Sequence, residues 1–493
     1  MAVHSLITAL GGYDVRPWHI AVGVAVAAVV VVGGFLLVRR FLWPTISKWT
    51  LTQQLALAGA VVLVAAGGAY AVYKALDRPG DVLNEDVEFK AEKPEKKVVK
   101  TVNWPVYGYD DERTRFLPTK RVNPPFHSSD WSFQAGKLLE FSPIVIEGKL
   151  YLLDKDALMY SLDASNGKVL WKKDLGSLSA ASPGWGDGRL FAVTLEPGTV
   201  QRIDPRTGKI LWQKNLGARS ETSPVVYGDK VIVGNESGTV FAFNVHNGDL
   251  EWTVDTAGAV KGGVALHDGV VYFGNYAGEV TAVQASNGDI KWQSGTQGGS
   301  FGTGGGIYST PAVAYGRVYV GSLDSRVYSF DADNGDLAWS QSTGAEVYPG
   351  PAVAEAGDAP PTVYIGSADK DLYAMDARTG AIRWHEDVGG IILGAASVVG
   401  HVVYIGVIGP KNGTIGFNPK TGRRVFEHEL GEYNPVISDG HRIYITGESG
   451  IRAFQADLKP GNAGNAKKHP EKKGNSKKGG AGSKKGTEGG GNA

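Results

Sequence analysis

A unit of about 40 residues recurs along the chain, and each copy closes with an Asn-Gly or Thr-Gly pair followed by an aromatic residue. In the clearest copy, residues 223–255, turn dipeptides separate four short apolar runs. Its last turn is Asn247-Gly248, and Trp252 follows five residues after the asparagine. Asn-Gly pairs tolerate positive φ and join antiparallel strands in tight hairpins. The repeat therefore predicts a unit of four antiparallel strands.

The closing aromatic residues stand 40 to 47 residues apart along the chain. They are Trp171, Trp212, Trp252, Trp292, Trp339, Trp384 and, in a degenerate copy, Phe426. A period near 40 residues with four strands in each unit is typical of a β-propeller, an all-β fold in which every unit is one blade. We expect these aromatic side chains to dock neighbouring blades on one another, as structural rather than catalytic residues.

The two ends of the repeat region predict an eighth blade. After Phe426, three more strands are expected at 435–438, 442–446 and 450–455, with no closing turn or aromatic residue. Trp131 lies one period before Trp171 and supplies the missing aromatic strand. Pairing strands from both chain ends would close the ring and remove its open edges. We predict eight four-stranded antiparallel blades within residues 104–458, with seven blades as the alternative.

Composition and motifs remove several classes of function. Lys and Arg together number 50, as do Asp and Glu, so the formal net charge is zero. A zero net charge gives no electrostatic reason to expect a nucleic-acid partner. Cysteine is absent, which excludes disulfides, thiolate metal ligands and thiol nucleophiles. No two histidines stand at metal-ligand spacing, and the motifs of hydrolases and P-loop enzymes are missing. We therefore predict no metal site and no catalytic residue.

Two apolar runs near the N-terminus predict a membrane anchor. Residues 19–38 and 55–73 are long enough to cross ~30 Å of hydrocarbon as helices. A cleaved signal peptide is the alternative for the first run, although it lacks a cleavage site of small residues. The loop 39–54 carries Arg39, Arg40 and Lys48, which places it in the cytoplasm by the positive-inside rule. The short N-terminal segment 1–18 and the propeller would then lie outside the cytoplasm, at the cell membrane.

The segments on either side of the predicted propeller lack apolar periodicity. Residues 74–103 form a linker. Within it, residues 81–100 are rich in Glu, Lys and Pro and are expected to be a solvated spacer. Residues 459–493, rich in Gly, Asn, Ser and paired Lys, are expected to be disordered. Their positive charge would suit anionic lipid or cell-wall polymer, the alternative being a solvated tail without a dedicated partner.

Particular residues carry a family resemblance. Two good copies of the repeat run from Tyr160-Ser161-Leu162-Asp163 to Trp171 and from Tyr373-Ala374-Met375-Asp376 to Trp384. With the segment that begins Trp104-Pro105, they resemble the pyrroloquinoline-quinone (PQQ)-like propeller superfamily. That superfamily contains PQQ- and Ca²⁺-dependent alcohol and glucose dehydrogenases, sensor domains, and the propeller subunit of the bacterial outer-membrane assembly machinery. This chain resembles the assembly scaffold more than the dehydrogenases, many of which carry a Cys-Cys pair over the cofactor.

Loops that lead into the innermost strand of each blade line one mouth of a propeller channel. The candidates that we expect there are Arg219, Glu221, Lys261, Tyr308 and Tyr348, with Glu140, Ser179 and Tyr433 on the same set of loops. Arg219 and Glu221 flank one loop and could form a salt-bridged polar spot. The glycine-rich insertion 298–306 opens no helix, so we interpret it as a flexible loop rather than a phosphate cradle.

Three functions remain open after these exclusions. We favour a membrane-anchored, extracytoplasmic propeller that binds protein or peptide partners as an assembly scaffold, without enzymatic activity. The alternative is a quinoprotein dehydrogenase that uses PQQ and Ca²⁺ to oxidise an alcohol or a sugar. A ligand-sensing propeller is the third. Fold alone does not separate them, because one propeller architecture hosts many unrelated sites.

Overall fold

The computed structural model describes residues 50–53, 80–91, 102–126, 129–298, 305–410 and 413–455. Both predicted membrane spans, 19–38 and 55–73, lie outside these ranges, as do the tail 459–493 and most of the insertion 298–306. Within the described ranges, no helix has the length and the apolar character needed to cross a membrane. The membrane anchor therefore stays a prediction.

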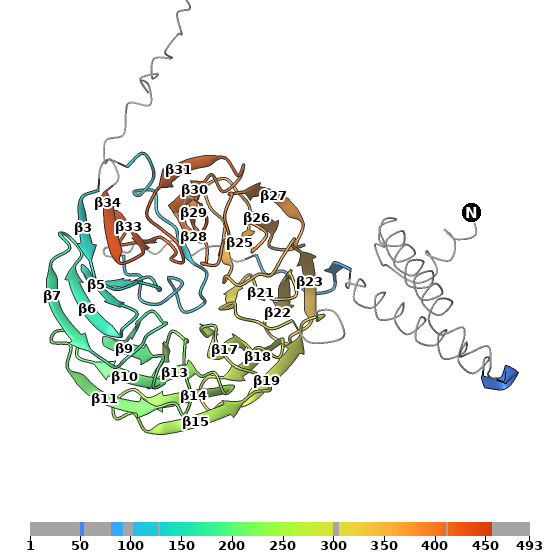
Figure 1. The fold of residues 1–493 in the computed structure, drawn as a ribbon, viewed down its shortest axis with the longest axis horizontal. Coiled ribbons are helices and arrows are strands. Elements are labelled where there is room, and N and C mark those ends of the chain that lie inside the picture. Colours follow the sequence, from blue (N-terminus) through green and yellow to red (C-terminus); the bar gives the residue numbers. More distant parts are fainter. Residues whose placement is uncertain are drawn as a thin grey trace, which may run out of the picture. The chain divides into compact units, whose positions relative to one another are not determined.

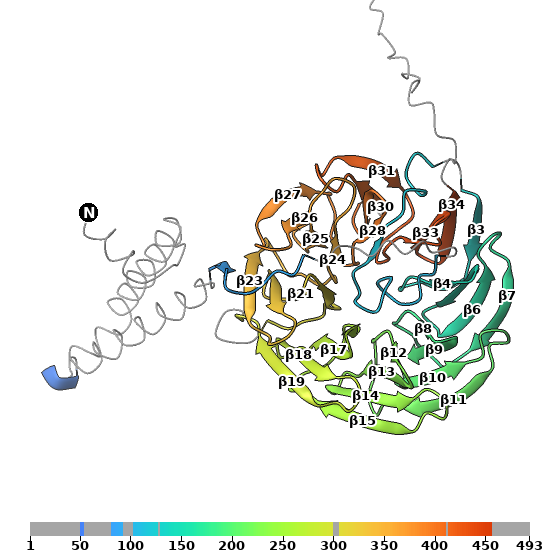
Figure 2. The same ribbon diagram turned by 180° about the vertical axis from the view of Figure 1, so that it is seen from behind.

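Eight sheets surround a common axis, and each contains one four-stranded antiparallel blade (Figures 1 and 2). In blades 1 to 7 the chain builds the innermost strand first and the outermost strand last. Blade 1 contains β4 (Ile144–Ile146), β5 (Lys149–Leu153), β6 (Leu158–Asp163) and β7 (Val169–Asp174). Blade 2 contains β8 (Gly184–Gly186), β9 (Arg189–Thr194), β10 (Thr199–Ile203) and β11 (Ile210–Asn215). Blade 3 contains β12 (Val225–Tyr227), β13 (Lys230–Gly234), β14 (Thr239–Asn244) and β15 (Leu250–Asp255).

The next four blades repeat this order. Blade 4 contains β16 (Ala265–His267), β17 (Val270–Gly274), β18 (Glu279–Gln284) and β19 (Ile290–Gly295). Blade 5 contains β20 (Ala312–Ala314), β21 (Arg317–Ser322), β22 (Arg326–Asp331) and β23 (Leu337–Ser342). Blade 6 contains β24 (Ala352–Ala354), β25 (Thr362–Gly366), β26 (Asp371–Asp376) and β27 (Ile382–Asp387). Blade 7 contains β28 (Ser397–Val399), β29 (Val402–Val407), β30 (Gly413–Phe417) and β31 (Arg424–His428).

Blade 8 is built from both ends of the repeat region. Its inner strands are β32 (Ile437–Ser438), β33 (Arg442–Gly447) and β34 (Gly450–Gln455), and its outermost strand is β3 (Trp131–Gln134). β3 runs antiparallel to β34, with Trp131 opposite Ala453 and Gln134 opposite Gly450. The predicted eight-bladed, all-β propeller is confirmed, and the alternative of seven blades is wrong.

The Asn-Gly and Thr-Gly turns form the hairpins between the third and fourth strands. In blade 3, Gly248 has a φ of +73°, a conformation that only glycine adopts without strain. Its N–H donates to the carbonyl of Asn244 at 2.8 Å, and the N–H of Asn244 donates to the carbonyl of Asp249 at 2.7 Å. The turn therefore sets the register that carries Trp252 onto β15.

Tryptophans at the closing position lie between consecutive blades. Each donates its indole Nε1–H to a backbone carbonyl of the following blade, at 2.9–3.1 Å. The donors are Trp131, Trp171, Trp212, Trp252, Trp292, Trp339 and Trp384. The turn glycine of the following blade lies against the same indole: a Cβ on Gly288 would stand 3.0 Å from Cδ2 of Trp252. One glycine thus bends its own hairpin and leaves room for the neighbour's ring.

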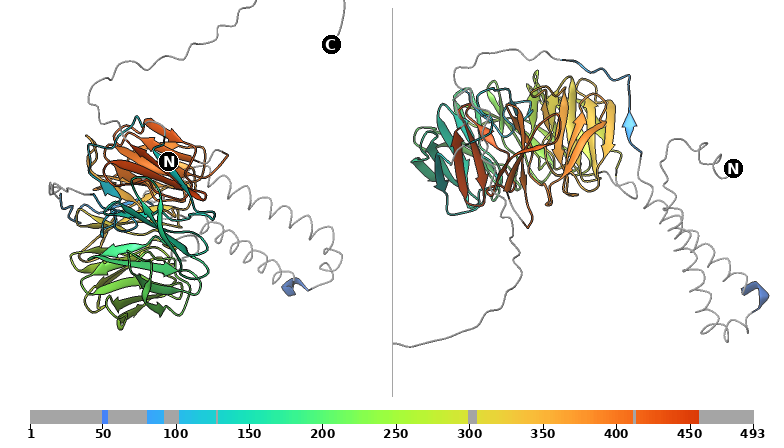
Figure 3. Two further views of the ribbon diagram at one scale, coloured as in Figure 1. Left: turned by 90° about the vertical axis from the view of Figure 1, so that its left-hand side faces the viewer. Right: turned by 90° about the horizontal axis from the view of Figure 1, so that it is seen from above.

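Part of the linker packs on blade 5 instead of being solvated. β1 (Val82–Leu83) pairs antiparallel with the outermost strand β23, with Val82 opposite Ser340 (Figure 3). The Asp81 carboxylate accepts hydrogen bonds from Arg326 Nη1 at 3.0 Å and from the N–H of Ser342 at 2.9 Å. Backbone pairing and ionic contacts therefore extend the blade by one strand.

Further along the linker, Arg317 of β21 holds the chain through backbone carbonyls. Its Nη2 donates to Val87 at 2.6 Å and its Nε donates to Glu88 at 3.0 Å. The guanidinium carbon also lies 5.7 Å from the centre of the Phe89 ring, within range of a cation–π contact. Residues 81–91 are therefore part of the folded ring, and the expectation of a solvated spacer is wrong for them.

Candidate functional site

The residues from Trp104 to Leu117, called here the crossing segment, run along the innermost strands of the ring (Figures 1 and 2). Its carbonyls accept hydrogen bonds from the N–H groups of Trp185, Leu266, Val313, Val353 and Val398, in five different blades, at 2.8–2.9 Å. Trp104 and Val145 exchange two further backbone bonds in blade 1. At its end, β2 (Phe116–Leu117) pairs parallel with β28. The protein's own chain therefore occupies the inner edge where the blades converge.

Two arginines of the crossing segment are fully buried. Arg113 donates to the carbonyls of Tyr107 at 2.6 Å and Val264 at 2.8 Å. Arg115 donates to the carbonyls of Arg113 at 2.7 Å and Pro351 at 2.9 Å. Burial lowers the pKa of both guanidinium groups, and that of Arg113, at about 10, keeps this side chain charged at neutral pH. These contacts tie the segment to blade loops on several sides of the ring.

Asp110 lies next to these arginines, and its side chain accepts from Thr114. Oδ1 accepts from the Thr114 N–H at 2.7 Å, and Oδ2 accepts from the Thr114 hydroxyl. Burial, followed by the charge of Glu112, raises the pKa of Asp110 to about 7. The crossing segment therefore contains one carboxyl group that changes charge near neutral pH.

At the mouth of the ring, Lys261 bridges two glutamates. Its Nζ lies 2.9 Å from Oε1 of Glu221 and 3.0 Å from Oε1 of Glu236. Burial alone would lower the pKa of Lys261, but its bonds to both carboxylates outweigh burial and raise that pKa. Burial likewise opposes ionisation of Glu236, yet Glu221 and Lys261 lower its pKa below the ordinary value. The ion pair of Lys261 and Glu236 therefore favours the charged form of each group.

Three tyrosines surround this ion-pair cluster. The Tyr308 hydroxyl donates to Oε2 of Glu221 at 2.8 Å, and burial together with that carboxylate raises the pKa of Tyr308. The Lys261 ammonium lies 5.8 Å from the centre of the Tyr276 ring. Tyr308 packs edge-on against Tyr276 and Tyr348, with ring centres 6.3 and 6.2 Å apart. Aromatic faces and paired charges from four loops between blades and two turns within blades thus form one polar surface.

The structure brings together four of the five residues proposed for the mouth: Glu221, Lys261, Tyr308 and Tyr348. Arg219 is exposed, and among the described residues Glu221 pairs with Lys261 instead of with Arg219. The carbonyl of Arg219 accepts from the N–H of Glu236 at 2.8 Å. The expected pair of Arg219 and Glu221 is therefore wrong.

The other three residues on these loops lie apart from the ion-pair cluster. Glu140 is close enough for the charge of Glu221 to add to burial in raising its pKa. Ser179 donates its hydroxyl to the carbonyl of Val193 at 3.3 Å and is buried. Tyr433 packs its backbone against Gly394. Of these three residues, only Glu140 carries a charge that interacts with the ion-pair cluster at the mouth.

Sequence reasoning missed Glu236 and Tyr276. Both lie in turns between the second and third strands, at Asn235–Gly238 in blade 3 and Asn275–Gly278 in blade 4. In an up-and-down blade these turns open on the same side as the loops that lead into the innermost strand. Considering the turns between second and third strands together with the loops before the innermost strands would have identified Glu236 and Tyr276 as well.

The residues at the mouth do not fit the PQQ and Ca²⁺ pair of the superfamily's dehydrogenases. Ca²⁺ takes six to eight oxygen ligands, most of them carboxylates and carbonyls. Both glutamates of the mouth are already bonded to Lys261. In the part of the chain that the structure describes, no three His, Cys, Asp or Glu side chains come together as a metal-ligand set.

The fold and its mouth define a protein of the PQQ-like propeller class, with eight blades and its own chain along the inner edge. A family profile described as outer membrane protein assembly factor BamB matches residues 128–258 and 247–463, more than half of the chain. The chain belongs to this family.

Solved structures of two kinds share the fold. The crystal structure of BamB from Moraxella catarrhalis is 18% identical, with a TM-score of 0.56, and the match covers 69% of this chain and 100% of that one. Quinohemoprotein alcohol dehydrogenase from Comamonas testosteroni is 13% identical, with a TM-score of 0.59 and coverage of 74% and 82%. Both similarities concern the fold alone.

Curated relatives match over short stretches. Quinoprotein glucose dehydrogenase from Escherichia coli is 26% identical over 155 residues, which are 29% of this chain and 19% of that protein. 1-Butanol dehydrogenase (cytochrome c) from Thauera butanivorans is 32% identical over 76 residues, which are 14% of this chain and 11% of that protein. The chain thus spans less than a fifth of either relative.

Proposed function

We propose that this protein is a membrane-anchored, extracytoplasmic scaffold that binds protein or peptide partners. Membership of the assembly-factor family carries the proposal. The mouth supports it, because Lys261 and the two glutamates are already paired with one another. Tyrosines beside paired charges are typical of protein contact surfaces.

The outer rim of the ring supports the same proposal. Exposed aliphatic side chains recur on the outermost strands of five blades, at Val169, Leu170, Leu211, Leu250, Ile290 and Ile382. Leu250 is 57% exposed and Ile290 is 55% exposed. In the proposed scaffold, these exposed apolar positions on blades 1 to 4 and 6 are where a partner contacts the rim.

Site-specific photocross-linking of the full-length chain in its native cells tests this function. A photoreactive residue replaces Leu250 on the rim or Tyr348 at the mouth, with exposed Lys120 as the control position. A discrete adduct with one protein at either test position, and none at Lys120, is expected. Equal labelling at all three positions would contradict a defined partner surface.

The absence of native cysteine makes the proposed orientation testable. A single cysteine at Lys172, exposed on β7, should react with a membrane-impermeant maleimide in intact cells, whereas one at Lys48 should react only after lysis. The reverse pattern would place the propeller in the cytoplasm.

The similarity to quinoprotein dehydrogenases makes the enzymatic alternative worth a direct test. The full-length chain is titrated with PQQ and Ca²⁺, while tryptophan fluorescence and dye-linked oxidation of alcohols and sugars are followed. We expect neither saturable binding nor turnover. One-to-one binding with turnover would overturn the scaffold proposal.

A further inference from the structure

The boundary between blades 7 and 8 departs from the other seven. Elsewhere the hairpin of the following blade covers the closing aromatic residue with a glycine and a carbonyl. Blade 8 cannot supply that hairpin, because its third strand β34 ends at Gln455 while its outermost strand β3 comes from the front of the chain. Among the residues that the structure describes, none gives Phe426, which replaces tryptophan at this boundary, the usual cover of a turn glycine and a carbonyl.

The loss of this hairpin also leaves a hydroxyl group unpaired. Five tyrosines of other blades donate to the turn carbonyl of the following blade: Tyr151, Tyr272, Tyr319, Tyr364 and Tyr444. Tyr404 holds the corresponding position in blade 7, and its buried hydroxyl has no hydrogen-bond partner within the described part of the chain. Its ring packs edge-on against Phe426, with ring centres 5.7 Å apart. The boundary is therefore incomplete in polar contacts as well as in packing.

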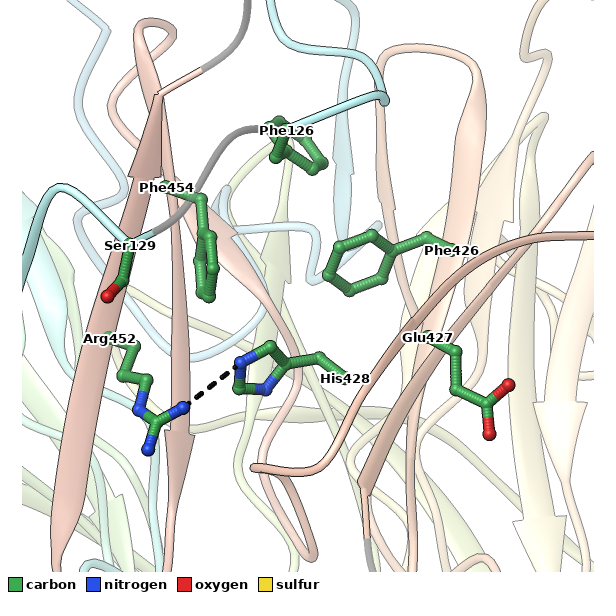
Figure 4. Close-up of a pocket in the computed structure, with 7 residues that line it drawn as sticks. All are labelled: Phe126, Ser129, Phe426, Glu427, His428, Arg452 and Phe454. Atoms are coloured by element: carbon green, nitrogen blue, oxygen red, sulfur yellow. Dashed lines mark hydrogen bonds between the residues drawn. The ribbon is translucent and has the colours of Figure 1, made fainter. Parts of the chain in front are cut away.

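A cavity of about 410 Å³ lies at this boundary (Figure 4). Three phenylalanines form its walls. Phe126 stands perpendicular to Phe426, with ring centres 5.5 Å apart, and Phe454 lies 6.4 Å from Phe126 and 6.5 Å from Phe426. This volume falls within the range of small-molecule sites, and such walls accept a flat aromatic ring.

Two nitrogen donors meet on one side of the cavity. The Leu430 N–H donates to Nδ1 of His428 at 2.9 Å, so the proton of a neutral ring resides on Nε2. Burial, followed by the charge of Arg452, lowers the pKa of His428 and favours that neutral ring. Nη1 of Arg452 lies 3.3 Å from Nε2 (Figure 4). In the tautomer with its proton on Nε2, both His428 and the guanidinium are donors, and neither has an acceptor among the described residues.

The remaining charge at the cavity does not supply that acceptor. Glu427 points away from Arg452 and His428 (Figure 4), as expected for the residue between Phe426 and His428 on a strand. Among the described residues, no carboxylate forms an ion pair with Arg452. An anionic oxygen beside Nε2 and the guanidinium would complete both sets of hydrogen bonds.

We propose that this cavity, called here the seam pocket, binds a small aromatic carboxylate. The ring of the ligand packs against the phenylalanines that line the pocket, and its carboxylate accepts hydrogen bonds from Arg452 and from Nε2 of His428. The seam pocket lies between blades and is separate from the cluster at the mouth, so the proposal does not depend on the scaffold function.

Calorimetric titration of the full-length chain with benzoate tests the proposal. Benzyl alcohol keeps the ring without the charge, and acetate keeps the charge without the ring. We expect saturable one-to-one binding of benzoate and binding of the two controls at least about tenfold weaker, because each lacks one half of the contacts. Absence of saturable benzoate binding, or equal binding of acetate, would overturn the proposal.

Two variants locate the site. Arg452→Gln keeps the length of the side chain, removes its charge and should weaken benzoate binding about tenfold or more. Arg423→Gln removes the same charge from an exposed position nearby in blade 7 and should leave the affinity unchanged. Urea midpoints equal to wild type show that both variants are folded. Equal affinity of wild type and Arg452→Gln would refute the site.

Discussion

The blade contacts differ in one detail that a pair of variants can expose. Trp292 donates to the carbonyl of Ala332 at 2.9 Å, and the Tyr272 hydroxyl donates to the same oxygen at 3.1 Å. Trp252 donates to the carbonyl of Ala285 at 3.0 Å and is the only side chain among the described residues that does so. Replacing either tryptophan with phenylalanine removes the indole donor. The carbonyl of Ala332 then keeps the Tyr272 hydroxyl as a donor, whereas the carbonyl of Ala285 keeps no side-chain donor among the described residues.

The structure fixes the size of the expected difference. Both indoles are 8% exposed, so the smaller phenyl ring leaves a comparable cavity at either site. At Ala285 the carbonyl also loses its side-chain donor, and an unsatisfied buried acceptor costs about 1–3 kcal/mol. Trp252→Phe should therefore reduce the free energy of unfolding by roughly 1–2 kcal/mol more than Trp292→Phe.

Urea unfolding of the full-length chain, followed by far-ultraviolet circular dichroism, measures both losses at a common m-value. A second comparison uses Tyr272→Phe, which removes the remaining donor at Ala332. Tyr272→Phe should reduce the free energy of unfolding more in the Trp292→Phe background than in the wild type, because the two donors share one acceptor. Equal losses for Trp252→Phe and Trp292→Phe, or strictly additive costs for Tyr272→Phe, would refute the role of the second donor.

Three further predictions concern other parts of the ring. Gly167→Ala should lower the melting temperature more than Gly217→Ala. Both glycines have φ above +70°, but only a Cβ on Gly167 would stand 2.5 Å from the Trp131 ring. Equal shifts in melting temperature would count against the docking contact. Asp110→Asn should flatten the pH dependence of stability. The folded pKa of about 7 exceeds the unfolded value of about 3.9, so the contribution of Asp110 to stability is complete below the unfolded pKa and is lost as the pH rises through 7. Urea midpoints across this range check it, and parallel profiles would contradict it. Asp81→Ala should speed limited proteolysis of the linker, whereas an unchanged cleavage rate would show that β1 pairing alone holds it.

Most of the fold could be predicted from the sequence, because the signals that define a blade are local. Each hairpin depends on a pair such as Asn247-Gly248, and the ring closure followed from placing Trp131 one period before Trp171. The crossing segment and β1 gave no such signal. Their hydrogen bonds go to residues far along the chain, and irregular backbone has no period to detect.

The candidate site was predictable as a location and not as a set of contacts. The rule that loops before innermost strands share one mouth brought Glu221, Lys261 and Tyr308 together. It did not predict that Lys261 would also bind Glu236, because that contact depends on how far neighbouring loops lean toward one another. The seam pocket was not predicted either. The sequence showed that blade 8 lacks a closing turn, but not which side chains would line the space beside Phe426.

The pairing of β3 with β34 has a consequence for biosynthesis. A ribosome makes Trp131 before any complete blade exists, and its strand partner Ala453 is made only after the other seven blades. Until β34 is made, the strand edge that β3 will cover does not exist. A chain interrupted anywhere between β3 and β34 therefore has an open ring. Closure therefore requires the strands of all eight blades, and a copy truncated before β34 presents unpaired strand edges to proteases and chaperones.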